Sequence, residues 1–243
     1  MTTQPRKRHR APRGSGELLR DQILDVTTEL LLDTGNAKAV SIRSVAQRIG
    51  VTSPSIYLHF ADKDTLLDAV CSRYFEKLDE EMQRASRPAG VDHPPTIEVL
   101  RAQGHAYVNF ARRTPELYRL ATMGEGRPGS DVDTALNSSA FQHMRATIAA
   151  LITEGIYPPG DATAMALELW TAAHGVAALL ISKPYLPWGD VEEFTDRVLR
   201  AVCTGQIVSG IIGTDLEPME TIARLKGLAD EHSADDIEEG HLP

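Results

Sequence analysis

The sequence has little that would suit a secreted, disulfide-rich or membrane-spanning protein. Only two of its 243 residues are cysteines, and Cys71 and Cys203 form no metal-binding or redox spacing. No apolar run reaches the length that spans a bilayer, and the first residues contain no apolar signal core. We therefore expect reduced thiols, a cytoplasmic location and no membrane partner.

Catalytic and metal-binding motifs are also missing. The eight histidines show no metal-ligand spacing, and the sequence contains no nucleophile elbow or cysteine–histidine signature. We expect no metal, no cofactor and no catalytic residue, and we expect the protein not to be an enzyme.

Positive charge is scarce overall and unevenly distributed. The net charge is −9, yet residues 1–63 carry ten Lys or Arg against six Asp or Glu, for a local charge of +4. The remainder carries −13, and apolar residues make up 42% of the chain, enough for a core. The asymmetry favours contact between the N-terminal part and a polyanion, although a solvated charged face has the same composition.

The stretch over residues 41–60 predicts two short helices joined by a tight turn. Apolar residues of the first helix recur on one face, at Ile42, Val45, Ala46 and Ile49. Ser41 is a suitable N-cap, and Gly50 suits the left-handed backbone that ends a helix. Ser53 can cap the second helix, with Pro54 at its first position.

Two short helices with a glycine turn and a shared apolar cluster form a helix-turn-helix. In DNA-binding examples, the second helix enters the major groove. Here Ile56 is its inward residue, and hydrogen-bonding side chains occupy the other side: Thr52, Ser53, Ser55, Tyr57 and His59. A plain helical hairpin is the alternative interpretation.

The flanking sequence predicts helices as well. Residues 17–34 have apolar residues at three- and four-residue steps, so they predict the first helix of a three-helix unit. Asp62 can cap a long helix over 63–85, which has Lys63 at its start. Residues 1–16 are expected to form a disordered basic arm, for which a solubilising tail is the alternative.

The rest of the chain also predicts an all-α fold. Helices are expected over 95–113, 115–123, 131–154, 161–182 and 190–212, with a weak helix to Leu228. The predicted inward residues of the helix over 190–212 are Val191, Phe194, Val198, Val202 and Ile207. The acidic stretch over 230–243 is expected to be disordered.

The string G-V-T-S-P-S-I-Y-L-H-F-A-D-K-D-T-L-L, at residues 50–67, resembles the tetracycline-repressor (TetR) family of bacterial transcription regulators. The matching elements are Gly50, Ile56-Tyr57, His59-Phe60, Lys63 and Leu66-Leu67. The resemblance covers about residues 17–70. The family usually has Thr-Leu-Tyr or Ser-Leu-Tyr where this chain has Ser55-Ile56-Tyr57. In the C-terminal part, Trp170 and His174-Gly175 resemble a subset of the family named for a Trp-His-Gly motif.

The resemblance implies a helix-turn-helix DNA-binding domain over 17–62 and a helical-bundle domain for ligand binding and dimerisation over 63–229. The helices over 161–182 and 190–212 would form a four-helix bundle between two subunits of a homodimer. The implied function is a repressor that binds a palindromic operator on double-stranded DNA and is released by a small hydrophobic effector. The alternatives are a helical small-molecule-binding protein or enzyme with a vestigial DNA-binding domain, and an architectural DNA binder.

The site residues fall into two sets. We expect base contacts from Arg43, Thr52, Ser53, Ser55 and Tyr57, and phosphate contacts from Tyr57, His59 and Lys63. The candidate effector site combines bulk with a few polar tips, and its members are Tyr107, Phe110, Phe141, Met144, Trp170 and His174. Packing is the alternative for His59, Tyr57 and each member of the second set.

Overall fold

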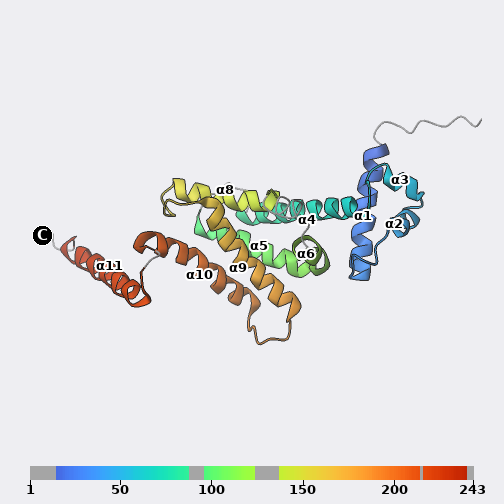
Figure 1. Ribbon diagram of the computed structural model, residues 1–243. Helices are drawn as coiled ribbons and strands as arrows, with labels where there is room; N and C mark the ends of the chain where they lie inside the picture. The colour runs from blue at the N-terminus through green and yellow to red at the C-terminus, as the bar shows by residue number, and fades with distance from the viewer. Residues whose placement is uncertain (1–14, 88–95, 124–136, 214–215, 240–243) are drawn as a thin grey trace, which may run out of the picture. The chain divides into compact units, whose positions relative to one another are not determined.

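The computed structural model describes residues 15–87, 96–123, 137–213 and 216–239, with side chains described up to residue 228 (Figure 1). Within these ranges the regular structure is helical, which confirms the predicted all-α fold. The predicted basic arm lies almost wholly outside the described residues, as does the Pro-rich break over 88–95.

The chain divides into two compact units, which are described separately. One contains the described parts of 1–77 and 113–138, and the other contains those of 78–112 and 139–243. The division falls inside one long helix, α4 (Lys63–Ser86). The domain boundaries taken from the sequence stay a prediction.

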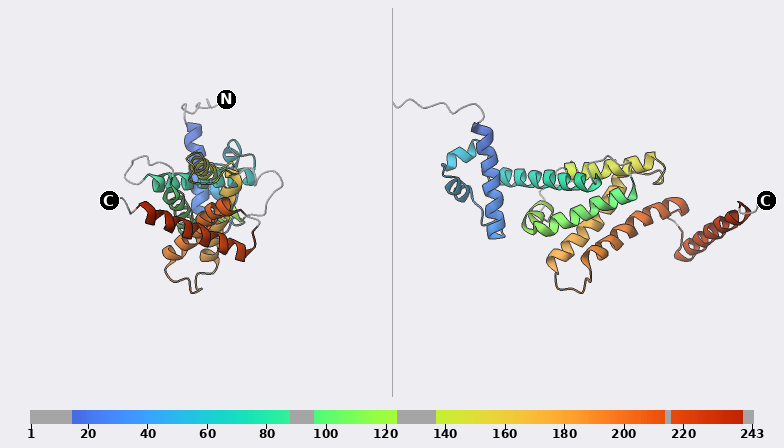
Figure 2. Two further views of the ribbon diagram at one scale, coloured as in Figure 1. Left: turned by 90° about the vertical axis from the view of Figure 1, so that its left-hand side faces the viewer. Right: turned by 180° about the vertical axis from the view of Figure 1, so that it is seen from behind.

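The first unit is built on α1 (Ser15–Thr34). Helices α2 (Ile42–Ile49) and α3 (Ser53–Tyr57) lie on one side of it, as Figures 1 and 2 show. The start of α4 and the short α6 (Pro115–Thr122) complete the unit. Its core is apolar and excluded from water, and it includes Ile23, Leu31, Val45, Ile56, Phe60, Leu66 and Val70.

Short-range signals determine where these helices begin and end. Ser41 and Ser44 form a capping box at the start of α2, and Gly50 ends it with a φ of 83°. The Asp62 carboxylate accepts the Thr65 N–H at 2.7 Å, so it caps α4 as predicted. The N-cap predicted for α3 was one residue off, because α3 begins at Ser53 and Thr52 is therefore its N-cap. The Thr52 hydroxyl makes no capping bond to the backbone and lies 3.0 Å from Ser55 Oγ.

The second unit contains the end of α4 and five further described helices. They are α5 (Ile97–Arg113), α8 (Ser139–Thr153), α9 (Ala162–Ser182), α10 (Val191–Ile212) and α11 (Pro218–Glu239). Helices α8 and α10 both pack along α9. Helix α9 is long and apolar enough to span a membrane by length and composition alone, but a core helix of a soluble protein passes the same test.

A close approach between α5 and α10 explains one wrong prediction. A Cβ on Gly104 would lie 2.8 Å from Leu199 Cδ1, so glycine is needed where Leu199 packs. The buried face of α10 therefore consists of Thr195, Leu199, Cys203, Gln206 and Ile212. The predicted inward residues Val191, Phe194, Val198, Val202 and Ile207 are only partly buried in the single chain.

Two predicted boundaries also differ from the structure. The stretch over 230–239 is helical, because α11 continues to Glu239, so the prediction of disorder was wrong there. Acidic charge does not prevent a helix in a segment that has no Pro after Pro218 and no Gly after Gly227. The helix predicted over 131–154 appears as α8, and residues 131–136 lie outside the described part.

Candidate DNA-binding and effector sites

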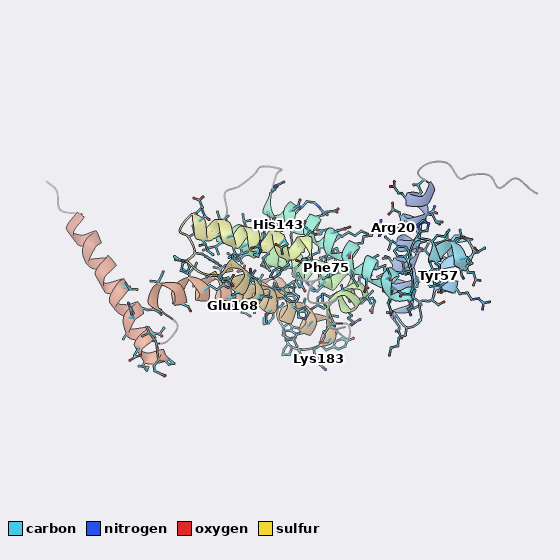
Figure 3. The ribbon with its side chains drawn as sticks, turned by 45° about the horizontal axis from the view of Figure 1, so that its top comes forward. Arg20, Tyr57, Phe75, His143, Glu168 and Lys183 are labelled. Carbon is cyan, nitrogen blue, oxygen red and sulfur yellow. The ribbon has the colours of Figure 1, made fainter. Side chains whose placement is uncertain are left out.

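The first candidate site is the outer face of α2 and α3. Buried Ile56 holds α3 against the core at 0% exposure, and the next residue, Tyr57, is 53% exposed (Figure 3). Arg43 on α2 and Thr52 before α3 are also exposed, and Ser53 and Ser55 are partly exposed. The predicted base-reading residues therefore belong to one small unit, and all of them have solvent access.

The turn between the two helices is closed by backbone hydrogen bonds. The N–H groups of Gly50 and Val51 both donate to the Ala46 carbonyl at 3.0 Å. After α3, the N–H groups of His59 and Phe60 both donate to the Ile56 carbonyl. These bonds hold α3 at both ends, so its exposed side chains are presented from a fixed backbone.

One of the predicted phosphate contacts, Lys63, has a local partner that the sequence does not indicate. Lys63 Nζ donates to the Ala37 carbonyl at 2.7 Å, which uses one of the three ammonium protons. Arg20 on α1 lies with its guanidinium carbon 5.3 Å from the centre of the Phe60 ring. Leu58, which follows Tyr57, is 85% exposed. The pairing of Arg20 with Phe60 has no signal in the sequence, because the two residues are forty positions apart.

The second candidate site lies in the second unit, where α5, α8 and α9 each supply an aromatic group. The Tyr107 hydroxyl lies 3.2 Å from His174 Nδ1. The Trp170 ring centre is 5.5 Å from that of His174 and 6.5 Å from that of Phe141, which it meets edge-on. We call Tyr107, Phe141, Trp170 and His174 the aromatic cluster.

Burial shapes the chemistry of the aromatic cluster. Loss of water around His174 lowers the pKa of its imidazole, so the ring is neutral at pH 7. A neutral imidazole both donates and accepts, and so does the Tyr107 hydroxyl. Groups of this kind bond hydroxyl and carboxyl groups of apolar molecules in general. The two remaining predicted effector residues, Phe110 and Met144, are buried on α5 and α8.

Two groups of polar residues in the second unit were not predicted. One surrounds Gln103, which is fully buried on α5. The other is an ionic group between α5 and α10, in which Asp196 bonds to Arg101, Arg200 and His105. Hydrogen bonds from Arg101 first, and then from Arg200 and His105, hold the pKa of Asp196 well below its usual range. For the first group, the sequence offered one signal, which is a glutamine, Gln103, within an otherwise apolar face of a helix.

Two family models match separate parts of the chain. The model for bacterial regulatory proteins of the tetR family matches residues 23–70, and the model for the tetracyclin repressor-like C-terminal domain matches residues 100–202. The two matches together cover more than half of the sequence, and the first covers the helix-turn-helix. The chain belongs to the TetR family. Membership of the Trp-His-Gly subset stays a prediction.

The relatives of this chain that have names differ in their named functions. The transcriptional activator FasR of Mycolicibacterium smegmatis is 30% identical over 47% of this chain and 49% of its own length. The nucleoid occlusion factor SlmA of Vibrio campbellii is 28% identical over 42% of this chain and 50% of its own. The matches thus span about half the length of these curated relatives. A solved protein of unknown function from Rhodococcus sp. RHA1 has the same fold, with a TM-score of 0.66, 24% identity and coverage of 84% of this chain and 100% of its own.

Proposed function

We propose that this TetR-family chain is a ligand-responsive, cytoplasmic transcriptional regulator, a repressor that binds a palindromic operator as a homodimer. The observation that carries the proposal is the hydroxyl-rich and aromatic face of α3, held outward by buried Ile56. Its fixed backbone matches what a helix needs to read a major groove. The unequal distribution of charge between residues 1–63 and the rest supports a polyanionic partner for this part of the chain.

In this proposal, Arg43 is the most selective base reader, because a guanidinium can bond two acceptors of guanine at once. The side chains of Thr52, Ser53, Ser55 and Tyr57 make more permissive contacts. His59 and Lys63 bind phosphate, together with Tyr57, and so set the register of the protein on the duplex.

The proposed dimer forms through α9 and α10. In the single chain α10 leaves Val191, Val198 and Val202 partly exposed, while Ile211 is 61% exposed. On α9, Leu179 is 48% exposed. Apolar residues of this kind on adjacent helices favour burial against a second subunit. Two such subunits would place their α3 helices about 34–36 Å apart, one turn of the duplex.

The proposed effector is a small hydrophobic molecule that binds at the aromatic cluster and weakens operator binding. Its apolar part would contact Phe141 and Trp170, and its polar group would bond Tyr107 or His174. Phe110 and Met144 would supply further apolar contacts from α5 and α8.

A gel shift with DNA from upstream of the protein's own gene tests the regulatory function. We expect a dimer to retard this fragment at low salt. Affinity should fall by about 0.9 log units per log unit of salt for each neutralised phosphate. Tyr57→Ala should weaken binding to every sequence, while Arg43→Ala should change the preferred bases in a binding-site selection. A protein that stays monomeric and retards no fragment would favour the alternative, a helical ligand-binding protein with a vestigial DNA-binding domain.

A further inference from the structure

A buried glutamine in the second unit has hydrogen-bonding capacity that the described residues leave unused. Gln103 lies on α5 and is 0% exposed. Its amide nitrogen, Nε2, faces Ser86 Oγ at 3.0 Å, Thr147 Oγ1 at 2.8 Å and His143 Nε2 at 3.3 Å. Its amide oxygen, Oε1, is equally inaccessible to solvent and has no donor among the described residues.

The two hydroxyl groups determine which way the amide points. Ser86 Oγ donates to the Met82 carbonyl at 2.8 Å, and Thr147 Oγ1 donates to the His143 carbonyl at 3.2 Å. With each hydroxyl proton directed to its own helix, both hydroxyls accept from Gln103 Nε2. Turning the amide over would bring Oε1 against two oxygen lone pairs. The nitrogen therefore faces the hydroxyls.

The third neighbour of the amide nitrogen is also an acceptor. His143, labelled in Figure 3, has its Nδ1 3.0 Å from a carboxylate oxygen of Asp79. The other oxygen of Asp79 accepts from Gln83 Nε2 at 2.9 Å. A carboxylate needs a donor, so Nδ1 carries a proton, and in the tautomer with its proton on Nδ1 the ring nitrogen Nε2 is an acceptor. Three acceptors thus compete for the two protons of the amide nitrogen, whereas the amide oxygen, Oε1, has no donor among the described residues.

Donors are therefore in short supply around Gln103, while apolar side chains are plentiful. Met82 on α4, Leu100 on α5 and Ile148 on α8 lie within a turn of the polar residues and are at most 3% exposed. Tyr107 of the aromatic cluster follows Gln103 by one turn of α5, about 6 Å along the helix. A buried acceptor without a donor is costly and rare in native proteins.

We propose that Gln103 Oε1 accepts a hydrogen bond from the effector, so that the effector is a neutral apolar molecule with at least one N–H or O–H group. Phenols, alcohols and primary amides belong to this class, whereas ethers and tertiary amides do not. The neutral form is required because an ion would lose its hydration without gaining an opposite charge, and Asp79 already has its donors. This inference rests on the proposed function, since it concerns the effector of the same unit.

Matched pairs of probes test the proposal: 4-tert-butylphenol with 4-tert-butylanisole, and 1-naphthol with 1-methoxynaphthalene. Each pair differs by one methyl group, which removes the donor and keeps the oxygen. With the full-length protein, calorimetric titration should show each phenol binding about tenfold more tightly than its ether. Equal binding within both pairs, or no binding of any of the four, would overturn the proposal.

The variant Gln103→Leu should abolish the difference between phenol and ether. It should also leave the thermal midpoint of the ligand-free protein within a few degrees, because Oε1 is unpaired and both hydroxyls keep their backbone acceptors. Gln103→Met, which keeps the length of the side chain, repeats the test if the leucine variant does not fold. A preference for phenols that persists in the folded variant contradicts the proposal, and so does a large fall of the midpoint in both variants.

Gln206→Leu is the matched control. Gln206 is another buried glutamine, on α10, and its Nε2 bonds to the Met165 carbonyl and to Glu168. Its Oε1, like that of Gln103, has no donor among the described residues, but it lies on a different helix. The Gln206→Leu variant should keep the preference for phenols over ethers. If this variant loses the preference, that result would also contradict the proposed role of Gln103. The gel shift separates the two proposals: operator binding without any preference for phenols rejects the role of Gln103 alone, whereas absence of operator binding rejects the proposed function.

Discussion

The two units of the molecule are specified by different kinds of interaction. In the first unit, caps and a glycine turn lie within a few residues of the helix ends that they stabilise, as Ser41 and Ser44 do for α2. In the second unit, the buried face of α10 depends on Gly104, which is 95 positions away from Leu199 in the sequence. Substitutions in the two units should therefore differ in size and in cause.

The largest effect is expected for Ile56→Ala in the first unit. Ile56 is completely buried, and α3 has only five residues to hold it in place. Removing the side chain should cost about 2–5 kcal/mol of unfolding free energy, and it should abolish operator binding by releasing α3. Urea unfolding followed by circular dichroism measures the loss. If the variant unfolds at the same urea concentration as the wild type, then backbone hydrogen bonds alone are sufficient to hold α3.

The second unit should respond strongly to Gly104→Ala. The new Cβ would stand 2.8 Å from Leu199 Cδ1, so either the Leu199 side chain would have to leave its packed position or α5 and α10 would have to move apart. Overpacking of this kind costs about 1–3 kcal/mol, which thermal unfolding can detect. Gly227→Ala is the control, because Gly227 lies in α11 with nothing within 4 Å of a new Cβ. That variant should gain about 0.5–1 kcal/mol, and equal losses in both would refute the close approach.

The ionic group between α5 and α10 predicts a pH dependence. The pKa of Asp196 is lowered in the folded state, so its stabilising effect is present above its unfolded pKa of about 3.9 and is lost as the pH falls toward the folded value. Wild type should therefore be more stable than Asp196→Asn at pH 6, and the difference should shrink below pH 4. Unfolding midpoints of both proteins between pH 3 and 7 measure this. A difference independent of pH would assign the effect to packing.

The smallest effect is expected for Arg48→Ala in the first unit. Arg48 links α2 to Asp33 at 3.4 Å and to Glu29 at 4.0 Å, and about half or more of each of these three side chains is exposed. Exposed ion pairs of this kind contribute about 0–1 kcal/mol. Urea unfolding in 0.05 M and 0.5 M salt should show a slight loss that salt removes. If Arg48→Ala lost as much unfolding free energy as Ile56→Ala, then surface ion pairs would matter as much as core packing in this unit, contrary to our expectation.

The sequence was sufficient for the fold of the first unit because the decisive signals there are local. The periodicity of Ile42, Val45 and Ala46 and the cap at Asp62 lie within the helices that they define. The inward face of α10 could not be predicted, because its stripe around Val198 is the more apolar one in sequence, whereas the buried stripe around Leu199 includes the polar residues Thr195 and Gln206. Which of the two is buried in the single chain depends on the neighbouring α5. Part of the aromatic cluster could be predicted from the sequence, because Trp170 and His174 are one helical turn apart.

The network of Gln103 was beyond sequence reasoning for another reason. A glutamine in a helix is ordinarily a surface residue, and nothing in its neighbours indicates that Ser86 and Thr147 lie beside it. The contact of Lys63 with the Ala37 carbonyl is similar, since a backbone acceptor has no residue type to recognise.

The placement of the two tryptophans gives the protein a built-in optical reporter. Trp170 belongs to the aromatic cluster, whereas Trp188 lies in the connection between α9 and α10, where its indole donates to the Lys183 carbonyl and its ring lies 5.1 Å from that of Phe194. Replacing Trp188 by phenylalanine would leave a single tryptophan in the whole chain. The emission of that one indole would then follow events around His174 without any added label.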